Sequence, residues 1–178
     1  MFYNTRFNDM NNFTYMFNYN RYWLDKELKR KNFDMDYDSK SILKLECKDE
    51  NSIEYFYDII DSTLKYGVTI CNVPSHSPES SGTGINLLAK KLANNKRIDA
   101  TECILRTKEI EKISINRSLT VKEQIETLEV TNTQLIRNKY ILLIDDIIKT
   151  GNSMKACKKL LIQNGAKNVK CFALGFVK

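Results

Sequence analysis

Two adjacent carboxylates follow an apolar run near the C-terminal end of the sequence. Residues 141–144 are Ile-Leu-Leu-Ile, and Asp145 and Asp146 come directly after them. Four apolar residues in a row are typical of a strand that is buried on both faces. In open α/β sheets, ligands bind beyond the carboxyl ends of such strands. Paired carboxylates there could accept hydrogen bonds from sugar hydroxyls or hold Mg²⁺ through water.

The turn after the acids has the residue types that bind a phosphate: Lys149, Thr150, Gly151, Asn152 and Ser153. Backbone N–H groups at a helix start point outward, and the helix dipole there favours negative charge. Gly151 lets the backbone approach a phosphate without a Cβ, and the hydroxyls of Thr150 and Ser153 can add hydrogen bonds. A phosphate beside paired acids predicts a phosphorylated sugar as the ligand.

Other classes of protein with acids at a strand end fit the sequence less well. A Walker B strand needs a G-x-x-x-x-G-K-[ST] loop upstream, and the sequence has none. The acidic pair of a receiver domain is expected near the N-terminus. Two β-lactamase boxes are matched by letter at 62–65 and 149–151, but S-D-N is missing and the chain is short. A dinucleotide fingerprint would need a third glycine beside Gly82 and Gly84. An acidic strand end that only begins a helix stays an alternative.

Strands and helices that would position these residues alternate from residue 41 onward. The expected strands are 41–47, 68–73, 100–105, 139–144 and 169–177, and the expected helices are 51–66, 85–94 and 151–163. Alternation of this kind is typical of an α/β fold with a parallel sheet covered on both faces. Residues 106–137 are mostly polar and lack a clear pattern, which predicts a functional lid or hood.

The first 40 residues have a different texture. Asn alternates with Phe and Tyr over residues 1–20, with neither helical nor strand periodicity. We interpret residues 1–40 as a partly ordered arm or hood with a short basic helix at 22–32, and residues 41–178 as the main domain. The aromatic rings also indicate a surface for a partner, such as a second copy of the chain, or for stacking a base.

Composition limits the class of protein. The chain has 28 Lys and Arg against 22 Asp and Glu, and a net charge of +6 favours anionic partners without choosing among them. No apolar run approaches the roughly 20 residues of a membrane helix, and no secretory signal is visible. Five cysteines without a C-x-x-C pair, and a single histidine, His76, do not suggest a zinc site or a disulfide framework. We therefore expect a cytoplasmic protein without a membrane partner.

The segment Ile141–Ser153 resembles the phosphoribosyl-pyrophosphate-binding motif of type I phosphoribosyltransferases. That motif has four apolar residues, Asp-Asp, two variable-to-apolar positions, a small hydroxyl pair, Gly, any residue, and Ser or Thr. The match fails at Lys149, where members often have Thr and purine-salvage enzymes often have Asp. Residues 67–178 are most similar to the competence-protein-F (ComF-like) branch, which also has Val-Pro after its first core strand (Val73 and Pro74). Arg106 and Gln124 loosely echo the lid pattern of that branch.

The resemblance implies a Rossmann-like type I phosphoribosyltransferase core, with a role for each predicted site residue. Asp145 and Asp146 would bind the ribose 2′ and 3′ hydroxyls and position Mg²⁺, and Lys149–Ser153 would hold the 5′-phosphate. The residues implied for pyrophosphate are Pro74, Ser75, His76, Ser77, Arg106 and Lys108. His76 also has the simpler interpretation of a solvated loop histidine.

Two hypotheses for function follow. The first is an enzyme that binds phosphoribosyl pyrophosphate or a nucleotide with Mg²⁺ and transfers the phosphoribosyl group to an unidentified nitrogenous acceptor, or hydrolyses the donor. The alternative is a sensor or adaptor that keeps the pocket without turnover. The ComF-like resemblance links this alternative to DNA handling, and the positive charge and aromatic arm would permit binding of single-stranded DNA.

Overall fold

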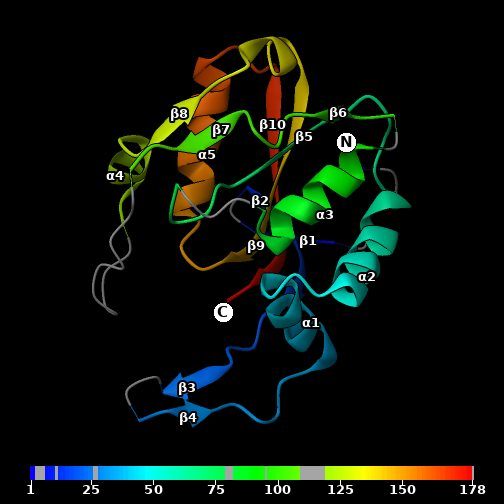
Figure 1. Ribbon diagram of the computed structural model, residues 1–178, viewed down its shortest axis with the longest axis vertical. Coiled ribbons are helices and arrows are strands. Elements are labelled where there is room, and N and C mark those ends of the chain that lie inside the picture. The colour runs from blue at the N-terminus through cyan, green and yellow to red at the C-terminus, as the bar shows by residue number, and fades with distance from the viewer. Residues whose placement is uncertain are drawn as a thin grey trace.

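A computed structural model describes residues 1–2, 7–10, 12–25, 28–78, 82–94, 96–108 and 119–177. Its largest feature is a six-stranded sheet with helices on both faces (Figure 1). The strands of this sheet are β1 (Asn8–Met10), β2 (Phe13–Asn18), β5 (Thr69–Asn72), β6 (Ile98–Asp99), β9 (Tyr140–Ile148) and β10 (Asn168–Phe176). Their order is β1-β2-β10-β9-β5-β6, and every neighbouring pair except β1–β2 is parallel. The parallel α/β core predicted from the sequence is confirmed.

Two hydrophobic cores fill the space on either side of the sheet. The helices are α1 (Tyr37–Glu46), α2 (Glu50–Asp61), α3 (Gly84–Ala93), α4 (Val121–Ile125) and α5 (Asn152–Gln163). Ile141 and Leu143 of β9 share a core with α5, while Leu142 and Ile144 share the other core with α1, α2 and α3. Successive side chains of a strand point to opposite faces, so residues 141–144 of β9 all have to be apolar.

The connections create a switch point between β5 and β9. The chain leaves β5 through α3 and returns in β6 on one side of β5. It leaves β9 through α5 and returns in β10 on the other side of β9. The two helices pack into opposite cores. In sheets of this kind the crevice at the switch point is where ligands bind. The residues that follow β5 and the carboxyl half of β9 border this crevice.

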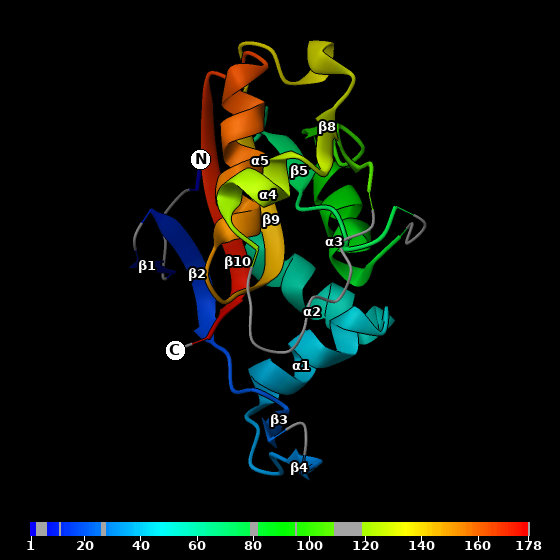
Figure 2. The same ribbon diagram turned by 90° about the vertical axis from the view of Figure 1, so that its left-hand side faces the viewer.

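Two small antiparallel sheets of two strands each complete the fold. One pairs β7 (Ile104–Arg106) with β8 (Leu128–Val130) and is followed by the short 3-10 helix η1 (Thr133–Leu135). The other pairs β3 (Trp23–Asp25) with β4 (Arg30–Lys31). Both views show the β3–β4 hairpin beyond α1, at the end of the molecule toward which β10 runs (Figure 2). None of the described helices is both long and apolar enough to cross a membrane.

Three expected elements differ in the structure. The strand expected at 41–47 is helix α1, which begins where the Asp36 carboxylate accepts a hydrogen bond from the Ser39 amide at 2.7 Å. Ile42 and Leu45 lie three residues apart, a spacing that fits a helix face, and both are fully buried. The basic helix expected at 22–32 is the β3–β4 hairpin. Of the strand expected at 100–105, only residues 104 and 105 lie in a strand, β7, while residues 100–103 form a turn between β6 and β7.

The N-terminal segment also differs from the partly ordered arm that its texture suggested. Strand β2 pairs in parallel with β10 over Cys171–Phe176, and Phe13, Tyr15 and Met16 are buried. Residues 13–18 are therefore a strand of the main sheet. The boundary at residue 40 between an arm and a separate domain stays a prediction.

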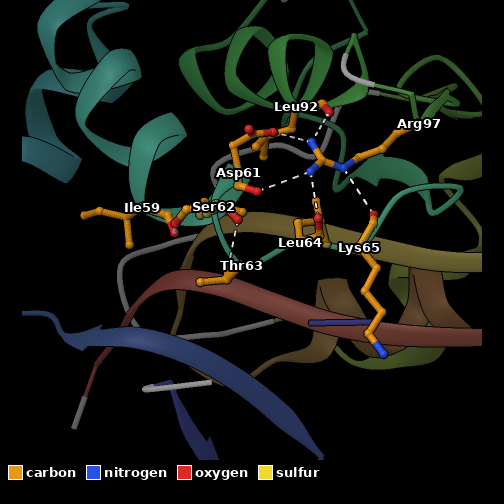
Figure 3. A network of polar contacts seen from close by, with 9 residues as sticks. Ile59, Asp61, Ser62, Thr63, Leu64, Lys65, Leu92 and Arg97 are labelled. Atoms are coloured by element: carbon orange, nitrogen blue, oxygen red, sulfur yellow. Dashed lines mark hydrogen bonds and ion pairs between the residues drawn. The ribbon is translucent and has the colours of Figure 1, made fainter. Parts of the chain in front are cut away.

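A polar clamp holds the amino end of β5 and β6, away from the switch point. Arg97 is buried, and its guanidinium donates hydrogen bonds to the Asp61 carboxylate and to the carbonyl oxygens of Leu64 and Leu92, both at 2.8 Å (Figure 3). Its Nε also donates to the Lys65 carbonyl at 3.3 Å. The clamp fixes the C-terminal ends of α2 and α3 to each other. These contacts support the fold and lie at the end opposite to the candidate site.

Candidate functional site

The acid pair lies within β9, which continues past the expected end at residue 144 to Ile148. Both Asp145 and Asp146 are half-buried. Backbone amides hold their carboxylates: the Asp146 N–H donates to Asp145 Oδ1 at 3.0 Å, and the Ile147 N–H donates to Asp146 Oδ1 at 2.6 Å. Because strand side chains alternate, Asp145 lies on the α5 face and Asp146 on the α1–α3 face.

The electrostatics of the pair favour a cationic or hydroxyl-donating ligand. Burial, followed by the charge of Asp146, raises the pKa of Asp145 well above its usual range. Burial also raises the pKa of Asp146, although the Ile147 amide and His76 act in the opposite direction. Two carboxylates so placed repel each other, and a cation or sugar hydroxyls would relieve that repulsion.

Two further residues that the sequence did not indicate border the acids. Burial and the nearby Asp146 charge raise the pKa of Glu46, at the end of α1. Burial, Glu46 and Asp146 raise the pKa of Tyr19 to about 12. Tyr19 follows β2 directly, and its N–H donates to the Phe176 carbonyl at 2.7 Å. Neither residue belongs to a motif, and only the three-dimensional structure brings them to the acids.

The turn after β9 leads into a helix whose N-cap has no side chain. Gly151 is the N-cap of α5 with φ of 73°, and the one side-chain contact to a first-turn amide among the described residues is a long one, from the Asn152 N–H to the Thr150 hydroxyl at 3.4 Å. In the four other described α-helices, the side chain of the N-cap Asp or Thr accepts a hydrogen bond from the first turn. The amides of the first turn of an α-helix have no acceptor inside the helix. The start of α5 therefore offers N–H groups to an anion, beside the exposed Lys149 and Thr150.

Protein contacts support the turn from two sides. A Cβ placed on Gly151 would lie 2.5 Å from Cζ of Phe13 in β2, so the side-chain direction of this glycine points at a ring and not at an open space. On the other side, Asn152 Nδ2 donates to the Leu119 carbonyl at 2.8 Å. Ser153 is half-buried at the first turn of α5. The structure thus places all five predicted phosphate-binding residues in one turn next to the acids.

The loop Pro74–Ser77 lies at the carboxyl end of β5, beside the acids on β9. The Val73 N–H donates to the Ile144 carbonyl at 3.0 Å, which joins the two strand ends. Within the loop, Ser75 Oγ donates to the Ser77 carbonyl at 2.8 Å. His76 is exposed and acts on the pKa of Asp146. The structure therefore brings this loop and the acid pair together.

Arg106 is placed differently from an exposed lid residue. It ends β7 and is only 7% exposed. Its Nε donates to the Ser75 carbonyl at 3.0 Å, and its Nη1 donates to Gln124 Oε1 at 3.2 Å and to the Thr127 hydroxyl. In the part of the chain that the structure describes, no carboxylate pairs with it. Burial lowers the pKa of Arg106. Lys108, two residues later, is exposed.

A hollow of about 440 Å³ adjoins the Pro74–Ser77 loop. Its walls come from the end of β5, the start of α3, and β7, and Arg106 is part of the lining. Neither the acid pair nor the turn 149–153 lines it. The acids on β9 are thus followed by the start of α5, and the neighbouring strand β5 leads to the hollow, whose lining contains the buried cation Arg106 beside the ion pair of Lys90 and Glu102.

Comparison with curated proteins found no match. Among solved structures, an alanine mutant from a study of an invariant aspartic acid in HPRTs has 8% identity and a TM-score of 0.36, over 76% of this chain and 67% of that one. Hypoxanthine phosphoribosyltransferase from Staphylococcus aureus has 13% identity and a TM-score of 0.33, over 75% and 62%. The Trypanosoma cruzi hypoxanthine phosphoribosyl transferase has 9% identity and a TM-score of 0.36, over 76% and 64%.

The profile that describes the phosphoribosyl transferase domain matches residues 85–175. This range is more than half of the 178 residues, and it contains the acid pair and the turn into α5. The chain therefore belongs to the phosphoribosyl transferase domain family.

Proposed function

We propose that this protein binds phosphoribosyl pyrophosphate with Mg²⁺ and transfers the phosphoribosyl group to a nitrogenous acceptor. The observation that carries the proposal is the order of features at the switch point. A helix start with a glycine N-cap follows the half-buried acid pair on β9, and a hollow with a buried cation adjoins the loop after the neighbouring strand β5. Phosphoribosyl pyrophosphate has a phosphate at one end, a diol in the middle and a pyrophosphate at the other end.

Each part of the ligand then has a chemical partner. The amides of the first turn of α5, with Lys149, would hold the 5′-phosphate. Asp145 and Asp146 would accept hydrogen bonds from the ribose 2′ and 3′ hydroxyls. Because the backbone amides of residues 146 and 147 already orient both carboxylates, little order would be lost when the sugar binds.

The acid pair also suits Mg²⁺. Among the described residues, no cluster of three or more His, Cys, Asp or Glu could hold a metal. Mg²⁺ is commonly held by one or two carboxylates together with substrate phosphates and water, so Asp145 and Asp146 are sufficient. When bound, the ion would neutralise negative charge on the pyrophosphate leaving group.

The leaving group would lie on the side of Pro74–Ser77, with Arg106 and Lys108 as its cations. Nη2 of Arg106 has no acceptor among the described residues, which supports a role toward a ligand in the hollow. The predicted lid at 106–137 would exclude water from the sugar cation. Most of its middle, residues 109–118, lies outside the described residues, so the lid stays a prediction.

The proposal is tested by incubating the protein with phosphoribosyl pyrophosphate, Mg²⁺ and a panel of nitrogenous bases. The expected result is release of pyrophosphate that depends on Mg²⁺ and on one acceptor, and that Asp146→Asn abolishes. A second measurement is thermal stabilisation by phosphoribosyl pyrophosphate with and without Mg²⁺. Stabilisation without turnover would favour the non-catalytic alternative. The absence of both stabilisation and turnover would reject the pocket.

A second candidate function is a ComF-like sensor or adaptor that binds single-stranded DNA. The observation in its favour is the β3–β4 hairpin with the segment after it, residues 21–37. Phe33 and Tyr37 there are 83% and 69% exposed, and Lys31 Nζ lies 5.5 Å and 5.7 Å from the ring centroids of Tyr22 and Trp23. Exposed rings beside cations are the features on which bases stack and phosphates bind.

This second candidate is tested with a labelled oligothymidylate over a range of salt concentrations. Binding that weakens with salt and is lost in Phe33→Ala would support it. Tyr140→Ala is the matched control, because Tyr140 is also an exposed ring near a lysine, Lys167, but lies on β9 at the other end. Equal loss in both variants would contradict a role for the hairpin. Loss of a dimer in Phe33→Ala, with no DNA binding, would assign the surface to a second copy of the chain.

A further inference from the structure

Phe13 of β2 touches the turn that would hold the 5′-phosphate. The three atoms nearest to a Cβ built on Gly151 all belong to the Phe13 ring, at 2.5, 2.7 and 3.4 Å. Phe13 is 6% exposed, and Lys155, on the first turn of α5, lies over the same ring with Nζ 5.6 Å from its centroid. Phe13 therefore contacts the N-cap of α5 and one residue of its first turn.

This contact matters because the N-cap of α5 has no side chain to fix the start of the helix. An N-cap side chain usually accepts hydrogen bonds from the amides of residues two or three positions on, whereas at α5 the Thr150 hydroxyl accepts only from the Asn152 N–H, at 3.4 Å. Gly151 has φ of 73°, and glycine is the residue with the greatest freedom to leave such a conformation. The shape of the turn then depends on packing against other parts of the chain. Phe13 supplies that packing on one side, and the Asn152–Leu119 hydrogen bond supplies it on the other.

We propose that Phe13 is a positioning residue for the turn 149–153, so that the N-terminal strand β2 contributes to the ligand site. The identity of the ligand rests on the proposed function, whereas the claim that Phe13 holds the turn in shape does not. The ring presses Gly151 into the conformation that directs the amides of residues 153 and 154 outward. Anion sites made of backbone amides bind well only when those amides are held in place before the ligand arrives.

The role is distinct from that of an ordinary core residue. Tyr15 lies two residues along the same strand and on the same face, and its ring packs on Phe176 with centroids 5.1 Å apart. Loss of either ring costs stability, since both are buried. Only the loss of Phe13 should also change the turn. Tyr15→Ala is therefore the matched control for Phe13→Ala.

Two measurements on the full chain test the inference. The first is hydrogen exchange of the Lys155 amide without ligand, because this amide donates to the Gly151 carbonyl at 2.9 Å and reports the closed turn. The second is the Kd of ribose 5-phosphate by calorimetry. In Phe13→Ala we expect exchange at Lys155 to become faster relative to the rest of α5, and Kd to rise by about tenfold or more. Tyr15→Ala should change neither, and Phe13→Leu should restore most of both.

The outcomes separate the inference from the proposed function. If Phe13→Ala and Tyr15→Ala change Lys155 exchange and Kd equally, or if neither changes them, the positioning role is overturned. If the wild-type chain binds no ribose 5-phosphate, the proposed phosphate site fails, and exchange at Lys155 alone decides whether Phe13 holds the turn. Should Phe13→Ala fail to fold, the same comparison is made between Phe13→Val and Tyr15→Val, which remove the rings but keep more of the buried volume.

Discussion

Nε of Arg106 donates a hydrogen bond to the carbonyl oxygen of Ser75, 3.0 Å away. The bond ties β7 to the loop that follows β5, and it places a buried guanidinium beside that loop without a carboxylate partner among the described residues. Burying a charge without an opposite charge is costly. A bound anion would offset that cost, which is the physical reason to look for the pyrophosphate on this side of the acids.

Arg106→Lys tests this relationship. Lysine keeps the charge but cannot reach three acceptors in the fork geometry of arginine. We expect the Kd of phosphoribosyl pyrophosphate to rise by about tenfold or more, with that of ribose 5-phosphate unchanged, because only the former has the pyrophosphate. Calorimetric titration of both ligands measures this. Lys122→Ala, an exposed cation on α4, is the control. Equal weakening of both ligands would instead assign Arg106 a general structural role.

Asp145→Asn should make the ligand-free protein more stable while removing its activity. The pKa of Asp145 is raised, so the folded protein holds this proton more tightly than the unfolded chain does. At neutral pH, ionisation of Asp145 therefore costs folding free energy, and the amide avoids that cost. We expect a gain of about 1–2 kcal/mol in urea unfolding at pH 7.

The gain should shrink as the pH falls below the raised pKa, because Asp145 is then protonated in the folded state and resembles Asn. The control is Asp58→Asn, an exposed residue of α2, which should change stability little at either pH. An Asp145→Asn variant less stable than the wild type at pH 7 would mean that the hydrogen bond from the Asp146 amide outweighs the repulsion.

Much of the core and the centre of the site could be predicted from the sequence because their signals are local. The apolar run at 141–144 indicated β9, and the apolar spacing after Gly151 indicated α5. Parallel strands end at the same edge of a sheet, so the loop after β5 could be expected beside the acids. These features depend only on residue type and short spacing, which one sequence contains in full.

The rest could not be predicted because it depends on contacts between distant residues. Phe13 pairs with Cys171, and no local pattern in an Asn-rich segment indicates a parallel partner so far along the chain. Arg106 looks like any polar residue at the start of a polar stretch, and its burial follows from Gln124 and Thr127. The strand expected at 41–47 is wrong, because a short apolar run fits a strand or a helix equally well and this one lies in helix α1.

Gly151→Ala should destabilise the protein more than the same change at Gly67. Both glycines have positive φ, 73° and 72°, so both substitutions carry the same backbone strain, about 1–2 kcal/mol. A Cβ at Gly67 meets nothing within 4 Å, whereas at Gly151 it overlaps the Phe13 ring. The extra loss at Gly151, measured by urea unfolding, should fall when Phe13→Leu is added. Equal losses at the two glycines would show that the Phe13 ring moves aside freely.

One thiol should react readily in the folded protein. Cys47 is exposed after α1, while Cys71, Cys103, Cys157 and Cys171 are buried. Burial raises the pKa of Cys171 to about 11, so at pH 8 it is neither accessible nor ionised. Titration with an aromatic disulfide reagent at pH 8 should modify one thiol quickly, and Cys47→Ser should remove that phase. All five should react in guanidinium chloride, and a second fast thiol in native protein would contradict the buried placement.

Arg97 offers a test of whether stability and ligand binding are separate in this fold. Its guanidinium clamps α2 to α3 at the amino end of the strands, with a side chain 1% exposed against 21% for Asp61. Arg97→Ala leaves that carboxylate and several carbonyls without their partner, and we expect a loss of about 3–5 kcal/mol in unfolding free energy. Arg137→Ala, an exposed arginine, is the control. The clamp lies at the opposite end from the acids. The Kd of phosphoribosyl pyrophosphate, measured below the melting temperature of the variant, should therefore stay unchanged. A higher Kd would mean that the position of α3, which starts beside the hollow, depends on the clamp at its other end.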